Sequence, residues 1–278
     1  MEGEIIHPIG FDAGDKNVIV GTSEGTLRWP IRESFEGEIT LESPVRLPVG
    51  LGMGRISADG MKCAVAFEDR CEVFSTANPS DRVQTGSQPG MRFIDLSPDG
   101  SLMASGAWHH PGVVIWDTKT GRSLKELPSD EEAATVAFSP DGRRLVTATQ
   151  LEYNFLDVGS WKSVLRIPQQ PGNDFAAMMC FSRDGKILAG THSRNVVRLF
   201  DAATGQTLAD LESPDPRMVA SLSFNADGTQ LAVSEGVGAI RIWDLKLIRE
   251  QLAGMGLDWE ESPSAEMALK MTKAEDKK

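Results

Sequence analysis

Several kinds of residue are scarce in this chain of 278 residues, and each scarcity excludes a class of protein. The three cysteines, Cys63, Cys71 and Cys180, cannot build a disulfide framework with none left over, and no CxxC pair indicates zinc. Cys63 and Cys180 lie in alternating apolar runs, so we expect buried, reduced thiols and a reducing compartment. No apolar run approaches the ~18 residues of a membrane-spanning helix. The acidic N-terminus lacks the basic and then apolar segments of a secretory signal.

Basic residues are also in deficit. The chain has 28 Lys and Arg against 40 Asp and Glu, which gives a formal net charge of −12. Nucleic-acid binding depends on cations that neutralise phosphates, so nucleic acid and anionic membranes are excluded as partners. The content of 40% hydrophobic and 24% charged residues is typical of a soluble globular protein.

An internal repeat organises most of the chain. Five copies of a short turn sequence end in Asp-Gly, and their glycines are 40, 42, 43 and 43 residues apart. A degenerate sixth copy lies at 11–15, with its last two residues exchanged. The five complete copies are Ile56–Gly60, Leu96–Gly100, Phe138–Gly142, Phe181–Gly185 and Phe224–Gly228.

Each repeat has the pattern of a small antiparallel sheet. Ser-Pro-Asp-Gly favours a type I turn, because Pro presets φ at the second position and Gly adopts the positive φ that follows. The flanking runs alternate apolar and polar residues, as in Val113–Trp116 and Val196–Phe200. About four strands fit into each repeat, and such a sheet cannot bury both faces alone. Neighbouring sheets must therefore stack around an axis.

At these motifs the chain resembles the WD-repeat family of β-propellers. The resemblance rests on Ile-Trp-Asp at 115–117 and 242–244, on Phe-Ser-Pro-Asp-Gly at 138–142, and on the spacing. It implies an all-β propeller of about six four-stranded blades over residues 1–245. The repeats lie near 5–42, 50–88, 91–128, 134–168, 177–212 and 219–245. The Gly-His pair that opens many family repeats is absent, so we expect the buried Asp-His-Ser-Trp relay of those members to be missing and packing to hold the blades.

The chain after the last repeat differs from the repeats. Asp244 is placed to cap a helix, with Leu245, Ile248 and Leu252 on one face. Residues 243–259 are similar to a stretch that closes WD-repeat arrays in planctomycete-type bacterial serine/threonine kinases and related proteins. We predict a helix and cap over 246–259 that packs against the propeller side or is presented to a partner. A disordered polar tail is expected over 260–278.

Motifs for catalysis are missing. Gly50–Arg55 resembles a phosphate-binding loop, but it lacks the GxGxxG spacing and leads into a strand. We find no GxSxG, HExxH, kinase catalytic loop or metal signature. The sequence therefore predicts no enzyme activity, no cofactor and no metal. A propeller enzyme of the quinoprotein or lactonase type is the alternative, and it would need convergent acids, histidines or metal ligands near the axis.

The resemblance implies a binding face. In WD-repeat propellers, loops between the second and third strands share one face with the loops between blades, and partners dock there. The candidate partner-binding residues on these loops are Trp108, His109, His110, Tyr153, His192 and Arg194. Trp108 is either an exposed anchor or folds back onto its blade with solvated histidines. We expect a non-catalytic, cytoplasmic scaffold or regulatory propeller for an unidentified protein partner, related to bacterial signalling proteins.

The last blade raises the question of ring closure. Alignment places the innermost strand of the first blade at Ile6–Phe11, which leaves only Met1–Ile5 upstream to complete the last blade. We therefore predict a final blade, around Ile240–Trp243, that is three-stranded or poorly completed. Its open edge would invite pairing with another chain. Either the helix over Leu245–Leu252 covers this edge, or the protein is a fragment whose upstream segment once completed the blade.

Overall fold

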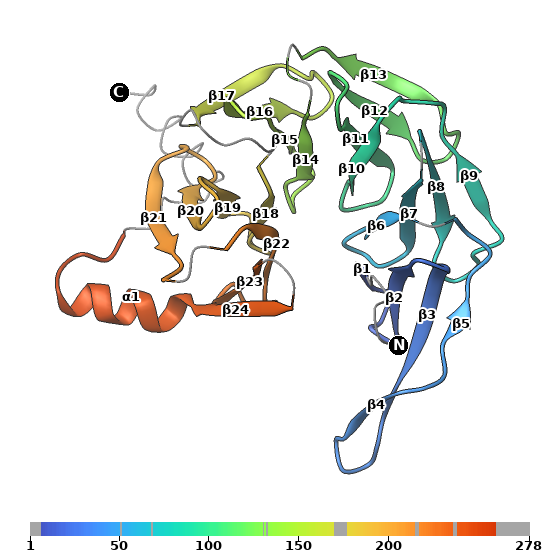
Figure 1. Ribbon diagram of the computed structural model, residues 1–278, viewed down its shortest axis with the longest axis horizontal. Helices are drawn as coiled ribbons and strands as arrows, with labels where there is room; N and C mark the ends of the chain where they lie inside the picture. The colour runs from blue at the N-terminus through green and yellow to red at the C-terminus, as the bar shows by residue number, and fades with distance from the viewer. Residues whose placement is uncertain are drawn as a thin grey trace, which may run out of the picture. The chain divides into compact units, whose positions relative to one another are not determined.

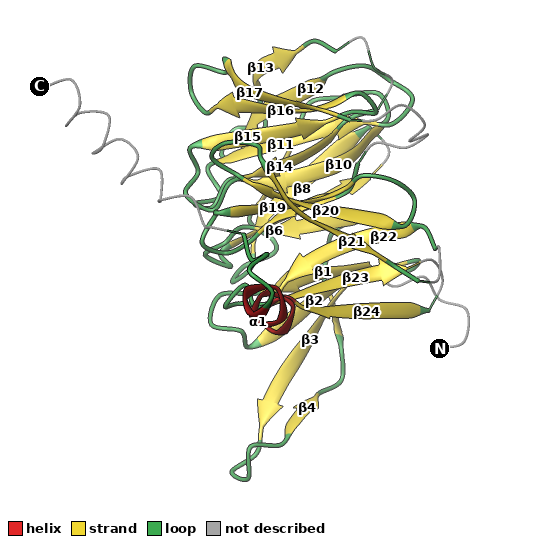
Figure 2. Ribbon diagram, turned by 90° about the vertical axis from the view of Figure 1, so that its left-hand side faces the viewer, coloured by secondary structure: helices red, strands yellow, loops and turns green. Residues whose placement is uncertain are grey.

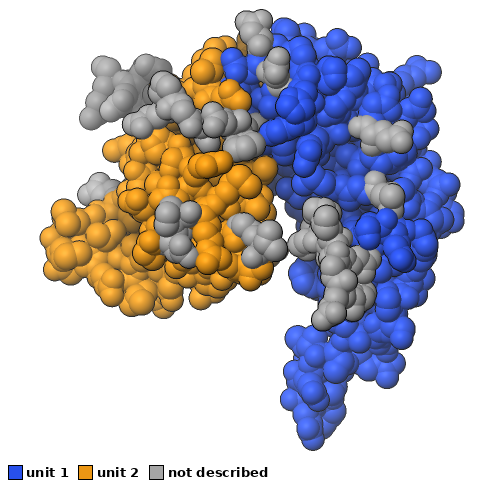
Figure 3. All heavy atoms as spheres, in the orientation of Figure 1, with its two compact units in different colours: residues 1–149, 157–160 blue, residues 150–156, 161–278 orange. Residues whose placement is uncertain are grey.

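The computed structural model describes residues 7–50, 52–67, 69–129, 131, 133–169, 177–214, 217–235 and 238–259. Within these residues the chain forms 24 strands in six antiparallel sheets and one helix (Figure 2). Two compact units are present (Figure 3). Unit 1 comprises residues 1–149 and 157–160, and unit 2 comprises residues 150–156 and 161–278.

Unit 1 contains blades one to three and the first half of blade four (Figure 1). Blade one consists of β1 (His7–Phe11), β2 (Asn17–Thr22), β3 (Gly25–Glu33), β4 (Ile39–Leu41) and β5 (Val45–Arg46). Blade two consists of β6 (Met53–Ile56), β7 (Lys62–Phe67), β8 (Arg70–Ser75) and β9 (Arg82–Gln84). Blade three consists of β10 (Met91–Leu96), β11 (Leu102–Ala107), β12 (Val113–Asp117) and β13 (Ser123–Leu127). Blade four begins with β14 (Thr135–Phe138) and β15 (Arg144–Ala148).

Unit 2 contains the remaining strands. Blade four ends with β16 (Glu152–Asp157) and β17 (Ser163–Pro168). Blade five consists of β18 (Met179–Phe181), β19 (Ile187–Thr191), β20 (Val196–Asp201) and β21 (Thr207–Glu212). Blade six consists of β22 (Val219–Phe224), β23 (Gln230–Glu235) and β24 (Ala239–Asp244), and α1 (Leu245–Gly254) follows. The predicted fold class, an all-β propeller of about six blades with a short C-terminal helix, is confirmed.

The repeated turn joins the first two strands of a blade by the same hydrogen bonds each time. In four copies the serine hydroxyl donates to the aspartate Oδ1 two residues later, over 2.6 to 2.7 Å. The same serine oxygen accepts from the backbone N–H five residues on. The following glycines have φ between 64° and 72°, where a side chain would be strained. The recurring Ser and Asp residues are therefore explained by turn structure.

The core lies between successive blades. One cluster joins blades two and three and includes Val73, Ile94, Met103 and Trp116. Another joins blades one and two through Ile9, Ile19 and Phe74 with their neighbours. A third joins blades five and six and is continued by Leu245 of α1, which is buried. Sheets that present apolar residues on both faces are thus covered by their neighbours, as the repeat requires.

Blade three contains a polar relay that we did not expect. The Trp116 Nε1–H donates to Ser105 Oγ over 2.7 Å, and the Ser105 hydroxyl donates to Gln88 Oε1. All three side chains are buried. Gln88 takes the place of the histidine in the family relay, because its amide carbonyl also accepts from the serine hydroxyl. Blade three therefore adds a buried polar relay to the packing that was expected to be the main source of cohesion between the blades.

Blade six has three strands within the described residues. Ile240 and Ile242 on β24 are 74% and 55% exposed, whereas Val113 and Ile115 at the corresponding positions of β12 are 3% and 0% exposed. Asp244 caps α1 as predicted, because its Oδ1 accepts from the Leu247 N–H over 2.9 Å. Ile248 and Trp259 pack against the same cluster as Leu245. Met1–Ile5 and the predicted tail over 260–278 lie outside the described residues.

Candidate protein-interaction site

Trp108 directly follows β11 and is held by backbone contacts on both sides. Its N–H donates to the Gly90 carbonyl over 2.7 Å, in the loop that enters blade three. Trp108 also forms an isolated antiparallel bridge with Ala133, in the segment that enters blade four. The loop that carries this tryptophan is therefore fixed to the two inter-blade segments beside it.

The Trp108 ring lies against its own blade. The Phe93 ring meets it edge-on at 6.0 Å between centroids, and the Arg92 guanidinium lies 5.5 Å from its centroid, within cation–π range. Trp108 is half-buried, whereas His109 and His110 are exposed. Of the two alternatives that the sequence left open, the structure matches the one in which the indole folds back and the histidines are solvated. The indole is not fully covered, because Trp108 lines an open hollow.

Glycine is required at position 90 for this arrangement. A Cβ atom built there would lie 2.4 Å from the Trp108 carbonyl oxygen and 2.7 Å from His110 Cδ2, and the backbone φ is 70°. A side chain would collide with the loop and would also be strained. Gly90 thus allows the Trp108 loop to lie directly on the segment that enters blade three.

A hollow of about 380 Å³ opens beside the indole. We call it the Trp108 hollow, and it is lined by Met53, Ala66, Gly90, Met91, Arg92 and Trp108. Flexible methionines adapt to the shape of an apolar group, and the exposed Arg92 provides a cation at the edge. These features suit an apolar or aromatic side chain that has an acidic neighbour.

Sequence reasoning found Trp108 but missed Met53, Met91 and Arg92. A signal for the methionines was present, because Gly52-Met53 and Gly90-Met91 occupy the same place at the start of two successive inner strands. The adjacent turn motifs are the stronger signal in the sequence, because they recur in every repeat. The Gly-Met pair occurs only twice at this position and therefore carries little weight as a repeat.

Tyr153 lies in the interior of unit 2, although the sequence predicted that it belongs to a binding surface. It is 1% exposed, its hydroxyl donates to the Thr191 carbonyl over 2.8 Å, and its ring meets Phe200 edge-on at 5.4 Å. Burial raises the pKa of its phenol. Tyr153 therefore cannot contact a partner directly. It supports the segment that leads into His192.

His192 and Arg194 also belong to unit 2. His192 is half-buried near the ion pair of Arg198 and Asp210, whose Nε and Oδ1 atoms are 2.6 Å apart. Burial, followed by the Arg198 charge, lowers the pKa of His192 and so favours the neutral imidazole. Arg194 is exposed. The Trp108 hollow, in contrast, is lined by residues of unit 1.

Groups that indicate chemistry are few. Among the residues that the structure describes, no cluster of three His, Cys, Asp or Glu side chains is placed to hold a metal ion, and no helix is long and apolar enough to cross a membrane. Cys63 and Cys71 are buried free thiols, and Cys180 is half-buried. Burial raises the pKa of Asp95 to about 6. Asp95 Oδ2 accepts from the Phe138 N–H over 2.7 Å, so this carboxyl joins β10 to β14.

No protein-family model matches the chain. Part of it is similar to eukaryotic translation initiation factor 3 subunit I of fungi. The identity is 35% over 72 residues for Aspergillus fumigatus (strain CBS 144.89 / FGSC A1163 / CEA10), 34% over 71 for Coccidioides immitis (strain RS) and 32% over 82 for Botryotinia fuckeliana (strain B05.10). These matches cover 26%, 26% and 29% of this chain. The matched segments span only 21%, 21% and 24% of the length of these relatives. The first two segments are shorter than two repeats of this chain.

Proposed function

We propose that this chain is a non-catalytic protein-interaction propeller whose docking site is the Trp108 hollow. One observation carries the proposal: a half-buried tryptophan on a fixed loop, with Arg92 over one side of its ring, borders an open hollow that two methionines line. Tryptophan and arginine are enriched among residues that dominate binding energy, and rigid scaffolds commonly present such residues on loops.

The relatives support the same kind of role. They are named as a subunit of a translation initiation factor, and a subunit works through contacts with other proteins. The acidic surface supports protein partners over nucleic acid. We also infer a cytoplasmic location, because a reducing compartment keeps the free thiols reduced. A link to bacterial signalling rests only on the resemblance of residues 243–259.

The experiment is affinity capture with the full chain as bait, in lysate of the source organism, followed by quantitative mass spectrometry. Proteins that wild-type bait retains should be lost with Trp108→Ala bait. For a purified partner, this substitution should weaken binding by about 2 kcal/mol or more, the usual cost at a dominant interface residue.

Trp161→Ala is the matched control. Trp161 is also half-buried, but it lies in the turn between β16 and β17 of unit 2. The control bait should keep the Trp108-dependent partners. If both variants retain the same proteins, or if Trp108→Ala loses them only because it unfolds, the hollow is not the docking site. Circular dichroism melting of each bait separates the two cases.

A further inference from the structure

Blade one carries a projecting hairpin that the described strands of blades two and three lack. β3 has nine residues, whereas the third strands of blades two and three have six and five. Near its start β3 pairs with β5, and farther out it pairs with β4. Residues 30–42, which we call the arm, thus extend beyond the remaining strands of unit 1 (Figure 1).

The arm has one apolar and one polar face. Ile31 lies opposite Leu41 and Glu33 lies opposite Ile39, so these pairs share a face. Ile39 and Leu41 are 69% and 51% exposed. On the other face Arg32 lies opposite Thr40, and its guanidinium forms an ion pair of 2.6 Å with Glu42.

Phe35 is fully exposed at the tip of the arm, on a well-defined turn. The Ser34 N–H donates to the Glu38 carbonyl, and the Glu38 N–H donates to Ser34 Oγ over 3.0 Å. Gly37 closes the turn with a φ of 79°. Glu33, Glu36 and Glu38 lie within three residues of Phe35 in the sequence. The tip therefore presents one aromatic side chain among three carboxylates.

Such a tip requires a complementary surface. A two-stranded hairpin is marginally stable in water, and contiguous exposed apolar side chains commonly mark an interaction site. The receiving surface must offer a pocket for one ring and a cation for the carboxylates. The Trp108 hollow offers both, because Met53, Met91 and Trp108 line it and Arg92 is exposed at its edge.

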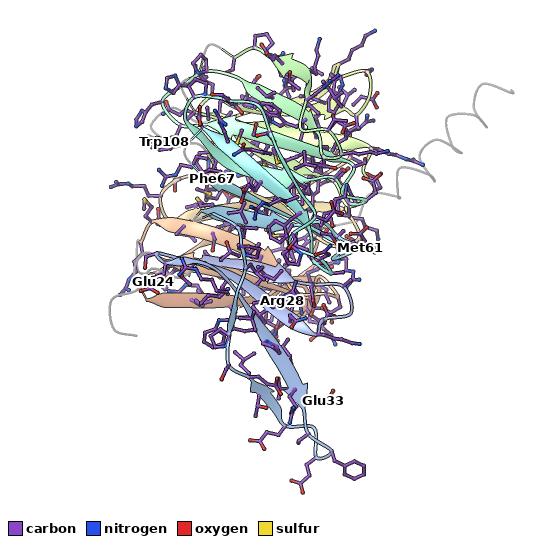
Figure 4. All side chains as sticks on the ribbon, turned by 90° about the vertical axis from the view of Figure 1, so that its right-hand side faces the viewer. Glu24, Arg28, Glu33, Met61, Phe67 and Trp108 are labelled. Carbon is purple, nitrogen blue, oxygen red and sulfur yellow. The ribbon has the colours of Figure 1, made fainter. Side chains whose placement is uncertain are left out.

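The arm cannot reach the hollow of its own molecule. Glu33 on the arm and Trp108 lie far apart within unit 1 (Figure 4). We propose that the arm of one copy docks Phe35 into the Trp108 hollow of a second copy. The inference rests on the proposed function in taking this hollow as a docking site. Reciprocal docking closes a dimer, whereas one-way docking forms longer chains.

The test places the photoreactive residue p-benzoylphenylalanine at position 35 of the full chain. Irradiation of the purified protein should give a covalently linked dimer, with Met53 or Met91 of the other molecule as the linked residue. The matched control carries the same label at Leu124, which is 55% exposed on β13 of the same unit. The control should give no linked dimer.

Sedimentation velocity over a concentration series provides a second readout. Phe35→Ser changes only an exposed tip residue, so it should leave folding intact and raise the dissociation constant of self-association by about tenfold or more. Arg92→Glu should have a similar effect. Adding Glu36→Lys and Glu38→Lys to Arg92→Glu should restore association, because the charges at the contact are then reversed on both sides.

Cross-links outside the hollow, or a chain that stays monomeric at all concentrations, would overturn this inference. The arm would then serve another partner or none. The proposed function fails differently, since it depends on whether Trp108→Ala bait loses proteins that wild-type bait retains. A monomeric chain whose other partners still require Trp108 would retain the proposed function and lose the inference.

Discussion

Removal of the Ser105 hydroxyl should destabilise blade three far more than a Ser→Ala change usually does. This hydroxyl accepts from Trp116 Nε1–H and donates to Gln88 Oε1, and all three side chains are buried. Ser105→Ala leaves a buried donor and a buried acceptor without this partner. Each orphaned group costs about 1–3 kcal/mol, so we expect a loss of about 2–6 kcal/mol in the free energy of unfolding.

The assay is urea unfolding followed by circular dichroism, with hydrogen exchange of β10 to β13 to localise the effect. Ser123→Ala, an exposed serine of the same blade, is the control and should change stability by less than about 0.5 kcal/mol. In a Gln88→Leu background, Ser105→Ala should cost at least about 1 kcal/mol less, because one of its partners is already gone. A loss below about 0.5 kcal/mol, or full additivity with Gln88→Leu, would refute the relay as a stabilising element.

Two further predictions concern Asp95 and the edge of blade six. The folded-state pKa of Asp95, about 6, lies above its ordinary value of 3.8, so its contribution to stability is present below about pH 3.8 and lost as pH rises through 6. Asp95→Asn should therefore gain about 3 kcal/mol relative to wild type at pH 7, and urea unfolding should show this advantage shrinking toward pH 4; a pH-independent difference would contradict the assignment. Amides of residues 238–243 should exchange faster than those of 112–116, since β24 pairs only with β23 within the described residues whereas β12 pairs with β11 and β13. Equal protection in hydrogen exchange by mass spectrometry would mean that another segment pairs with β24.

The periodic features of this protein could be predicted from its sequence because they recur in successive repeats. The turn at Ser139–Gly142 has the same hydrogen bonds as the turn at Ser97–Gly100, and their spacing alone fixes the blades. The helix cap at Asp244 could be predicted equally well, because a capping aspartate acts on the amphipathic run that directly follows it. The burial of Tyr153 could not be predicted from the sequence, because it depends on Thr191 and Phe200 in the next blade.

The features that distinguish this chain from a generic propeller are the departures from its own repeat. The role of Gln88 is visible only in the three-dimensional relay, because its partner Ser105 lies 17 residues away. The arm arises where about ten extra residues separate β3 from β5, so no other repeat offers a template for it. The Trp108 hollow needs glycine at position 90 as well as the tryptophan itself. Repetition therefore specifies the scaffold, whereas the exceptions to the repeat carry the surfaces that we propose for the recognition of a partner.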